Sequence, residues 1–457
     1  MDDLSLVREA QRAAERIARE VAALGGRVYY VGGCVRDSLM GISSRDLDIE
    51  VHGIPEEVLE GILSGTGSVR AVGRSFGIYS LGGIPLDIAL PRSEIPTGRG
   101  HRDFEIRVDP YCGTKAAAMR RDFTVNSIMK DVLTGKLTDH FGGRRDIRRK
   151  TLRYVDAHTF PQDPLRVLRA ARFASRLGFS LDRKTKELCC GIDLSVLSPE
   201  RVRDEMMNAL LYSDRPSVFF YVLRDTGRLS EWFPEIGALS DIPQDPLFHP
   251  EGDVFVHTMA VLDAGASLRG KAKDRESFML SCLCHDLGKA LTTTMTGGTI
   301  HSYGHEKASE ELAGTFLSRL RLPKAAIRDV MDLVLLHMKP TAEFRAVSKI
   351  KKTNALFDSC RNPEDLILLA EADYLGCGSA RGSYPGKLFL QMRLDVYRET
   401  MSDPFLGGGD LIRAGIEPGK DFSEYLAYAH KLRLAGEDRD SQLRQTLAYI
   451  KQKEKKR

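Results

Sequence analysis

The spacing of apolar residues along the chain changes once, near residue 150. Between residues 26 and 150, short apolar runs such as RVYYV, DLDIEV and FEIRV alternate with polar turns and with the helical stretch PEEVLEGILS. Short runs bounded by turn residues predict strands, so this part is expected to be mixed α/β. From residue 151 onward, apolar residues recur at helical spacing, as in DPLRVLRAARFASRL. The pattern therefore predicts an α+β head followed by a chain that is almost wholly helical.

Two breaks interrupt the helical part. Residues 238–253, ALSDIPQDPLFHPEGD, are rich in Pro and Asp and are interpreted as a linker, and a second break is expected near 338–346. The predicted parts are an N-terminal amphipathic helix over 1–25, the head over 26–150, a helical neck over 151–237, a further helical domain over 250–345, and a helical body and tail over 346–457.

Composition and charge narrow the class of protein. The 457 residues hold no apolar run near the ~18 residues of a membrane span, and the N-terminal stretch lacks the apolar core of a signal peptide. A cytoplasmic protein without a membrane partner is therefore expected. The eight cysteines show no CxxC spacing and are interpreted as buried reduced thiols. The net charge is only +4, but arginines crowd into residues 120–176, which indicates contact with phosphate, with RNA as the obvious candidate. For the basic end, KQKEKKR, a solvated face is the favoured interpretation.

Two aspartates in RDLDIEV form the first candidate site. Alternate residues of a strand share one face, so Asp46 and Asp48 are expected to project together while Leu47 and Ile49 face the core. Paired carboxylates suit Mg²⁺ when substrate phosphates complete its shell. Asp87 in PLDIAL is either a third carboxylate of this site or an ordinary strand-edge residue, and the sequence does not favour one over the other.

A glycine pair precedes these aspartates, directly after the predicted strand VYYV. Gly32 and Gly33 would let backbone N–H groups approach a triphosphate closely, and a helix expected to begin near Val35 would add its positive end. Arg36 could then pair with a phosphate.

GGCVRD followed by RDLD resembles the nucleotidyltransferase signature of the class II CCA-adding enzymes and bacterial poly(A) polymerases. The resemblance implies a head of the polymerase-β type with a mixed sheet, and two-metal nucleotidyl transfer with Mg²⁺ at the catalytic residues Asp46 and Asp48. It implies tRNA, ATP and CTP as partners and no protein partner.

Two further motifs extend the resemblance. MRRDFTVNSIM, 119–129, is similar to the family's RRDxxxNA motif, with Ser127 where alanine is commoner. This similarity implies that three residues contact the nucleotide and help to select ribose: Arg121, Asp122 and Asn126.

QDPLRVLRAARF, 162–173, resembles the family's EDxxRxxRxxRF, with Gln162 in place of the usual Glu. Cytosine and adenine each show an amino donor beside a ring-nitrogen acceptor, so Asp163 and Arg166 together could select C and A and reject G and U. Arg169 and Arg172 follow at three-residue spacing and are predicted to support nucleotide and phosphate; the alternative is a solvated arginine face.

Six of the eleven histidines lie between residues 249 and 337. The order H…HD…D resembles the HD phosphohydrolase superfamily, and two additional histidines fit its dinuclear members. The implied ligands are His257, His285, Asp286 and Asp373, with His305 and His337 as the extra pair. The donor set suits Mg²⁺ or a divalent transition metal, and the last ligand lies beyond the end assigned to the domain. The resemblance implies phosphatase or 2′,3′-cyclic phosphodiesterase activity on RNA ends or nucleotides.

The remaining segments are less specific. Residues 91–106, PRSEIPTGRGHRDFEI, are predicted to form a mobile loop, where the family has a flexible element linked to the change from CTP to ATP. Residues 408–437 resemble the family's C-terminal tRNA-contacting region.

The sequence is thus identified as a member of the CCA-adding family, with an α-helical HD domain. Repair or addition of the tRNA 3′-terminal CCA is the predicted activity, and the helical parts are expected to bind the acceptor arm by shape and phosphate contacts. Three alternatives stay open: a poly(A) polymerase, a partial enzyme that adds only CC or only A, and an HD phosphohydrolase with an RNA-binding head. A purely structural RNA-binding role would leave two sets of metal ligands unexplained.

Overall fold

The computed structural model describes residues 3–44, 46–65, 69–73, 77–96, 104–378, 382–402 and 405–454. The chain divides into two compact units. The first comprises residues 1–205 and 221–232, and the second comprises residues 206–220 and 233–457.

Among the described residues, the first unit is built on a seven-stranded sheet of order β3-β4-β5-β2-β1-β8-β9. Its strands are β1 (Arg27–Tyr30), β2 (Leu47–His52), β3 (Val69–Gly73), β4 (Ile78–Leu81), β5 (Leu86–Ala89), β8 (Met129–Asp131) and β9 (Leu137–Thr138). Strands β2 and β5 are parallel, whereas β1 is antiparallel to both of its neighbours. The predicted mixed sheet is confirmed.

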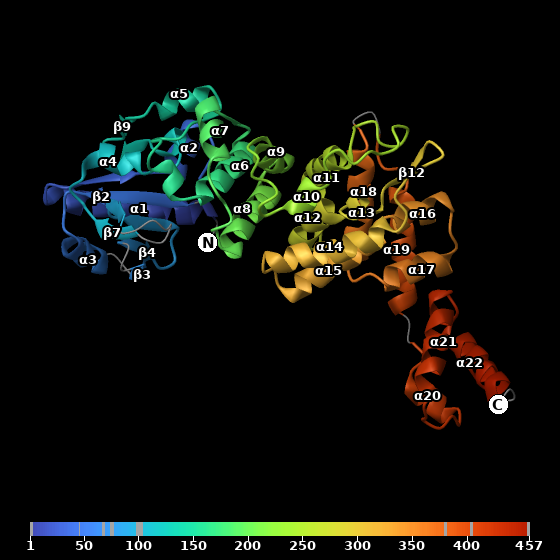
Figure 1. The fold of residues 1–457 in the computed structure, drawn as a ribbon. Coiled ribbons are helices and arrows are strands. Elements are labelled where there is room, and N and C mark those ends of the chain that lie inside the picture. The colour runs from blue at the N-terminus through green and yellow to red at the C-terminus, as the bar shows by residue number, and fades with distance from the viewer. Residues whose placement is uncertain are drawn as a thin grey trace. The chain divides into compact units, whose positions relative to one another are not determined.

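Helices cover both faces of this sheet (Figure 1). The apolar side chains of β2, at Leu47, Ile49 and Val51, enter one core with helices α1 (Asp3–Ala23) and α3 (Glu56–Ser64). On the opposite face, helix α4 (Gly113–Met119) packs in a smaller core with β1 and β8. Because side chains alternate along a strand, the polar residues of β2 at positions 48, 50 and 52 fall on the side away from α1.

The helical neck follows the sheet and docks through aromatic rings. Phe123 makes edge contacts with Phe160 and Phe173, at ring-centroid distances of 5.7 and 5.9 Å. The elements of this region are η2 (Thr124–Asn126), α5 (Gly143–Arg148), β10 (Thr151–Leu152), η3 (Phe160–Gln162), α6 (Leu165–Leu177), β11 (Ser180–Leu181), α7 (Arg183–Cys190), α8 (Pro199–Tyr212) and α9 (Ser217–Asp225).

The second unit is helical apart from one small hairpin in its described part. Its first elements are α10 (Pro234–Gly237), α11 (Val254–Leu268), η4 (Arg269–Lys271), α12 (Arg275–Cys284), α13 (Lys289–Thr292), β12 (Thr294–Thr296), β13 (Thr299–His301), α14 (His305–Arg319) and α15 (Lys324–Leu336). The later elements are α16 (Lys339–Arg345), α17 (Ile350–Asp358), α18 (Pro363–Gly376), α19 (Lys387–Ser402), α20 (Gly408–Arg413), α21 (Phe422–Leu434) and α22 (Arg439–Glu454). In the parts of the chain that the structure describes, no helix is long and apolar enough to cross a membrane.

Three expectations about local structure were wrong in part. The break expected near 338–346 is instead two short non-helical segments, at residues 337–338 and 346–349, which flank α16. Pro340 lies in the first turn of that helix, where a missing N–H costs no helical hydrogen bond. Residues 91–106 were predicted to form a loop, but they contain strand β6 (Arg92–Pro96) and the start of its antiparallel partner β7 (Phe104–Val108), while residues 97–103 lie outside the described residues. Cys112 and Cys190 are not buried, although all the cysteines are free thiols.

Candidate active sites

The carboxylates of the first motif gather where β2 and β5 run side by side. Asp48 is half-buried on β2 and stands in register with the exposed Asp87 on β5. Asp46 precedes the strand in an exposed bend, so the expectation that both aspartates belong to one strand was wrong by one residue. Burial raises the pKa of Asp48; Arg121 opposes this rise, and the charges of Asp87 and Asp46 add to it. The mutual repulsion of these carboxylates is what a bound cation would relieve.

The glycine pair lies against the same carboxylates. Gly32 has a φ of +70°, a conformation that favours glycine, and a Cβ at this position would stand 3.5 Å from Asp48 Oδ2. Helix α2 (Gly33–Leu39) begins two residues earlier than expected. Arg36 is only 4% exposed, and its guanidinium donates to Asn126 Oδ1 at 2.7 Å and to Asp37 Oδ1 at 2.8 Å. In this structure Arg36 is therefore part of the support of the site, and its contact with a phosphate stays a prediction.

A cavity of about 430 Å³ connects the first and third motifs. Its lining includes Asp48, Asp87, Arg121, Asp163 and Arg166. Cavities that hold small molecules run from about 300 Å³ upward, so the space suits a nucleotide. The structure thus brings together the carboxylates and the predicted base-reading residues, although Asp163 lies more than a hundred positions after Asp48 in the sequence.

The residues of the second motif form a buried hydrogen-bonded cluster beside this cavity. Asp122 is 7% exposed and accepts hydrogen bonds from Asn126 Nδ2 at 3.0 Å and from Arg169 Nε at 2.8 Å. Burial raises the pKa of the Asp122 carboxyl, but Arg169 and Asn126 outweigh this and hold it below its usual value. Residues predicted from two separate motifs therefore hold one another in place. Ser127 is buried and donates to Thr124 O at 2.9 Å.

Asp163 and Arg166, which are predicted to recognise the base, form hydrogen bonds with other groups of the protein in this structure. Asp163 accepts from Arg201 at 3.0 Å on both carboxylate oxygens, and both side chains of this pair are more than a third exposed. Arg166 donates to the backbone carbonyls of Thr159 at 2.6 Å and Arg120 at 2.7 Å. Arg172 is 9% exposed and bonds to Glu205 of α8, so the alternative of a solvated arginine face does not apply to it.

In the second unit, the candidate metal ligands sit at the ends of helices. His285 and His337 directly follow α12 and α15, and His305 opens α14. In each of these rings Nδ1 donates to a backbone carbonyl: Cys282 O at 3.0 Å, Ser302 O at 2.7 Å and Val334 O at 2.7 Å. This hydrogen bond fixes the tautomer and leaves Nε2 as the free lone pair.

These Nε2 atoms meet in pairs. The Nε2 atom of His257, which lies within α11, is 3.3 Å from Nε2 of His285. The Nε2 atom of His305 is 3.4 Å from Nε2 of His337. Two acceptor lone pairs at this distance need a proton or a metal ion to hold them together. Each pair has a carboxylate close enough to share a metal ion with it. The first such group is His257, His285 and Asp373, and the second is His305, His337 and Asp286.

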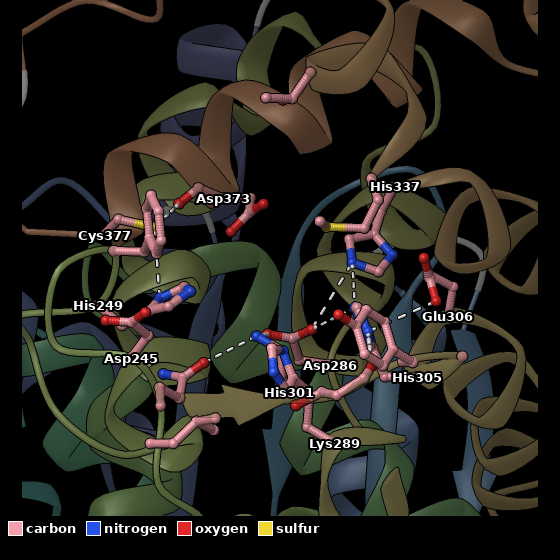
Figure 2. Close-up of a pocket in the computed structure, with 18 of the residues that line it drawn as sticks. Asp245, His249, Asp286, Lys289, His301, His305, Glu306, His337, Asp373 and Cys377 are labelled. Atoms are coloured by element: carbon pink, nitrogen blue, oxygen red, sulfur yellow. Dashed lines mark hydrogen bonds and ion pairs between the residues drawn. The ribbon is translucent and has the colours of Figure 1, made fainter. Parts of the chain in front are cut away.

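Asp286 connects the two groups. Its Oδ2 lies 3.3 Å from His285 Nε2. Its Oδ1 lies 3.4 Å from His305 Nε2 and 3.8 Å from His337 Nε2 (Figure 2). Lys289 Nζ adds a contact to Oδ2 at 2.7 Å. A carboxylate with one oxygen toward each imidazole pair has the arrangement of a bridging ligand between two cations.

The charges of this cluster favour cations at its centre. Burial raises the pKa of Asp286, but Lys289 and His285 outweigh burial and hold it well below its usual value, so it stays ionised. Burial would lower the pKa of His257, yet the contact with Asp373 raises it well above the ordinary value. A positive charge at His257 Nε2 is therefore favoured, and a metal ion supplies it as well as a proton does. Burial and the neighbouring His285 lower the pKa of His337 to about 4, so this ring stays neutral, as a ligand must be.

Sequence reasoning missed residues that support both sites. Glu50 continues the alternation of Asp46 and Asp48 on β2, and it is buried and accepts from Arg121 at 3.1 Å; the same period of two could have found it. Glu251 accepts from His257 Nδ1 at 2.8 Å but lies in the stretch interpreted as a linker, where nothing in the local pattern marks it.

Comparisons with known proteins agree with this geometry. Models of three families match the chain: the poly A polymerase head domain over residues 28–153, the HD domain over 254–376, and the probable RNA and SrmB- binding site of polymerase A over 178–239. The multifunctional CCA protein of Pasteurella multocida (strain Pm70) is 36% identical over 380 residues, which cover 80% of this chain and 87% of that protein. The chain belongs to the multifunctional CCA protein family.

Solved structures agree in fold. The Bacillus stearothermophilus CCA-adding enzyme in complex with CTP is 21% identical with a TM-score of 0.70, over 96% of this chain and 98% of that one. The Thermotoga maritima CCA-adding enzyme complexed with tRNA is 20% identical with a TM-score of 0.62, over 98% and 96%. The predicted membership of the CCA-adding family and the predicted succession of a mixed-sheet head and a helical body with an HD domain are both confirmed. Nucleotidyltransferase heads and HD domains of these families generally work with divalent metals.

Proposed function

We propose that this CCA-family enzyme is a template-independent tRNA nucleotidyltransferase that adds or repairs the 3′-terminal CCA of tRNA from CTP and ATP, and that it carries a second, metal-dependent phosphohydrolase site. Membership of the family supports the class of reaction. The observation that carries the assignment to residues is the single cavity that contains Asp48 and Asp87 at one side and Asp163 and Arg166 in its lining.

The carboxylates of the head would hold Mg²⁺. Asp46 and Asp48 offer oxygen donors only, beside a glycine turn that leaves room for phosphates, which fits the preference of Mg²⁺ for carboxylates completed by substrate oxygens. Bound there, Mg²⁺ would activate the RNA 3′-hydroxyl and stabilise the leaving pyrophosphate. Arg121, which lies beside Asp48 and is held by Glu50, would place its positive charge toward the triphosphate.

Base selection would come from Asp163 and Arg166. The ion pair of Asp163 with Arg201 is exposed and is worth about 1 kcal/mol or less, so an incoming base can replace it. Asp163 would accept from the amino group that C and A share, and Arg166 would donate to the adjacent ring nitrogen. Gln162, at the end of η3, has no part in this scheme.

The proposal also assigns a role to each predicted part of the chain. We assign residues 1–25 to an N-terminal helix, 26–150 to the nucleotidyltransferase head, 151–237 to a neck that binds nucleotide and RNA, 250–345 with a ligand near 373 to the HD domain, and 346–457 to a tRNA-binding body. A tRNA-processing role places the enzyme in the cytoplasm.

The HD cluster carries the second function. Its opposed Nε2 pairs and the position of Asp286 favour two cations, and imidazoles select a divalent transition metal more strongly than carboxylates do, although Mg²⁺ is also compatible. Metal ions there would supply an activated water and polarise a phosphoester of an RNA end or a nucleotide.

The proposal is tested with tRNA transcripts that end before CCA, after C and after CC. Each is incubated with Mg²⁺ and CTP, ATP or both, beside Asp48→Ala. Ordered addition of C, C and A that then stops, and that Asp48→Ala abolishes, is the expected result. An unbounded A tail would instead indicate a poly(A) polymerase, restriction to one nucleotide a partial enzyme, and no incorporation an RNA-binding head that serves the HD site.

A further inference from the structure

A second set of metal-type donors lies beside the HD cluster. His249, Glu251, His257 and Cys377 each offer one atom, and these four atoms lie within 4.8 Å of one another. His249 and Cys377 face each other in Figure 2, away from His305 and His337. His257 separates the two clusters, because its Nε2 faces Asp286 and Asp373 while its Nδ1 faces Glu251.

The hydrogen bonds within this set leave one buried carboxylate oxygen without a donor. Glu251 Oε1 is contacted by two rings, by His249 Nδ1 at 3.0 Å and by His257 Nδ1 at 2.8 Å. Its other oxygen, Oε2, is buried without a hydrogen-bond partner among the described residues, and the side chain is 8% exposed. The Nδ1 atom of His249 also faces Cys377 Sγ at 3.8 Å. A buried carboxylate oxygen with no donor is unfavourable, and a bound cation would satisfy it.

The donor set differs in kind from that of the HD cluster. It adds a thiolate to an imidazole and a carboxylate, a combination that favours Zn²⁺ over Mg²⁺ or Mn²⁺. Bond lengths of roughly 2.3 Å to sulfur and 2.0 Å to nitrogen put the two ligand atoms about 3.5 Å apart in a tetrahedral site, close to the Cys377–His249 separation. His249 and Cys377 also line a cavity of about 540 Å³ together with Asp286 and His337, so a solute can reach them.

Chain geometry explains how both clusters share the same elements. Asp373 and Cys377 are one helical turn apart at the end of α18, so they lie one above the other on the same face, and each belongs to a different cluster. Glu251 and His249 lie in the stretch just before α11, which carries His257. The segment interpreted as a linker is therefore the source of two ligands.

We propose that His249 Nδ1, Glu251 Oε2 and Cys377 Sγ bind a zinc ion, with a fourth position open to the cavity. The ion is separate from the HD cations. Glu251 takes it on one oxygen and keeps the hydrogen bond from His257 on the other, so the zinc site positions His257 through Glu251. This site does not depend on the reaction that the HD cluster performs.

Cobalt substitution tests the site without any activity measurement. The full-length protein is stripped of metal and titrated with Co²⁺, and a cobalt–thiolate charge-transfer band in the near ultraviolet is expected. Cys377→Ser should lose the band and one equivalent of tight cobalt. Cys360→Ser, at another buried cysteine, and Asp286→Asn, in the HD cluster, should keep the band. A band of equal intensity in Cys377→Ser, or no band in the wild-type protein, would overturn the proposal.

A second measurement keeps the test valid if Cys377→Ser does not fold. Alkylation of each cysteine in the wild-type protein is followed by mass spectrometry with and without Zn²⁺. Zinc is expected to slow the labelling of Cys377 at least tenfold and to leave the exposed Cys190 unchanged. In His249→Gln this protection should require a higher zinc concentration. Equal labelling of Cys377 with and without zinc contradicts the site.

Discussion

The head and the HD cluster both collect charged side chains for phosphoester chemistry, but with different donors and in different surroundings. In the head, Asp46 and Asp87 are exposed and Asp48 is half-buried, and every candidate ligand atom is a carboxylate oxygen. In the HD cluster, four imidazoles and two carboxylates meet between helix ends, and the rings are buried. Open carboxylates leave room for substrate phosphates in the metal shell, whereas a crowded imidazole cluster offers most of a metal shell from the protein's own ligands.

The largest effect is expected from removing the half-buried carboxylate of the head. Asp48→Asn should lower nucleotide addition at least about a thousandfold, because a metal contact to the reacting phosphate is worth several kcal/mol. Glu57→Gln, an exposed acid on α3 over the opposite face of the sheet, is the matched control and should leave the rate unchanged. Single-turnover addition to a tRNA ending in CC measures both. Full activity of Asp48→Asn would place the chemistry elsewhere.

Exchange of the metal ion tests whether the carboxylates of the head and the imidazoles of the HD cluster prefer different metals. After chelation, Mg²⁺ should restore nucleotide addition, whereas Mn²⁺, Co²⁺ or Ni²⁺ should restore hydrolysis of a nucleoside 2′,3′-cyclic phosphate at least about tenfold better than Mg²⁺ does. Rates at matched concentrations of each ion are the measurement. If Mg²⁺ served hydrolysis equally well, the imidazole donors would not control the choice of metal.

Base selection depends on a weaker set of contacts. Asp163→Asn should relax discrimination against UTP by roughly tenfold to a hundredfold, since each mismatched buried group costs about 1–3 kcal/mol. Arg201→Gln removes the partner of Asp163 in this structure but leaves its carboxylate, so it should keep the selection of C and A. The ratio of kcat/KM for CTP and UTP measures both variants. An equal loss of discrimination between CTP and UTP in the two variants would mean that Asp163 acts through its ion pair with Arg201 and not by contacting the base.

The last effect is on the stability of the fold and not on a reaction. Asp122→Asn should lower the free energy of unfolding by about 1–2 kcal/mol at neutral pH, because it removes the nearer of the two carboxylates that contact Arg169 and leaves only Glu205, at 3.8 Å. The pKa of Asp122 is below its ordinary 3.8 in the folded state, so the stabilisation is complete above pH 3.8 and is lost as the pH falls through the lower folded value. Denaturant unfolding at pH 7 and pH 3 should show the difference between wild type and variant shrinking at pH 3. A difference that grows in acid would contradict the pairing.

The first site could be predicted well because its signals are local. Strand alternation and a glycine turn lie within twenty residues of Asp46 and Asp48, and backbone geometry carries them to one place. The resemblance to the family supplied the rest of the site. Sequence reasoning could not foresee that Arg169 would be held by Asp122, since that contact depends on how the neck docks on the sheet.

The second site was predicted from a pattern, not from geometry. Ligands spread between His257 and Asp373 meet because five helix ends converge, and no local periodicity encodes that packing. The opposed Nε2 atoms and the two-sided role of Asp286 were therefore unforeseen. Glu251 and His249 were missed for the same reason, since a stretch rich in Pro and Asp carries no periodic signal even when it supplies buried side chains.

The two sites are proposed to perform separate reactions with separate metals. The most direct test measures both reactions in the same preparations of the wild-type protein, Asp48→Asn and Asp286→Asn. Asp48→Asn is expected to lose ordered CCA addition and keep hydrolysis of the cyclic phosphate, and Asp286→Asn is expected to do the reverse. Loss of both reactions in either correctly folded variant would contradict two independent sites.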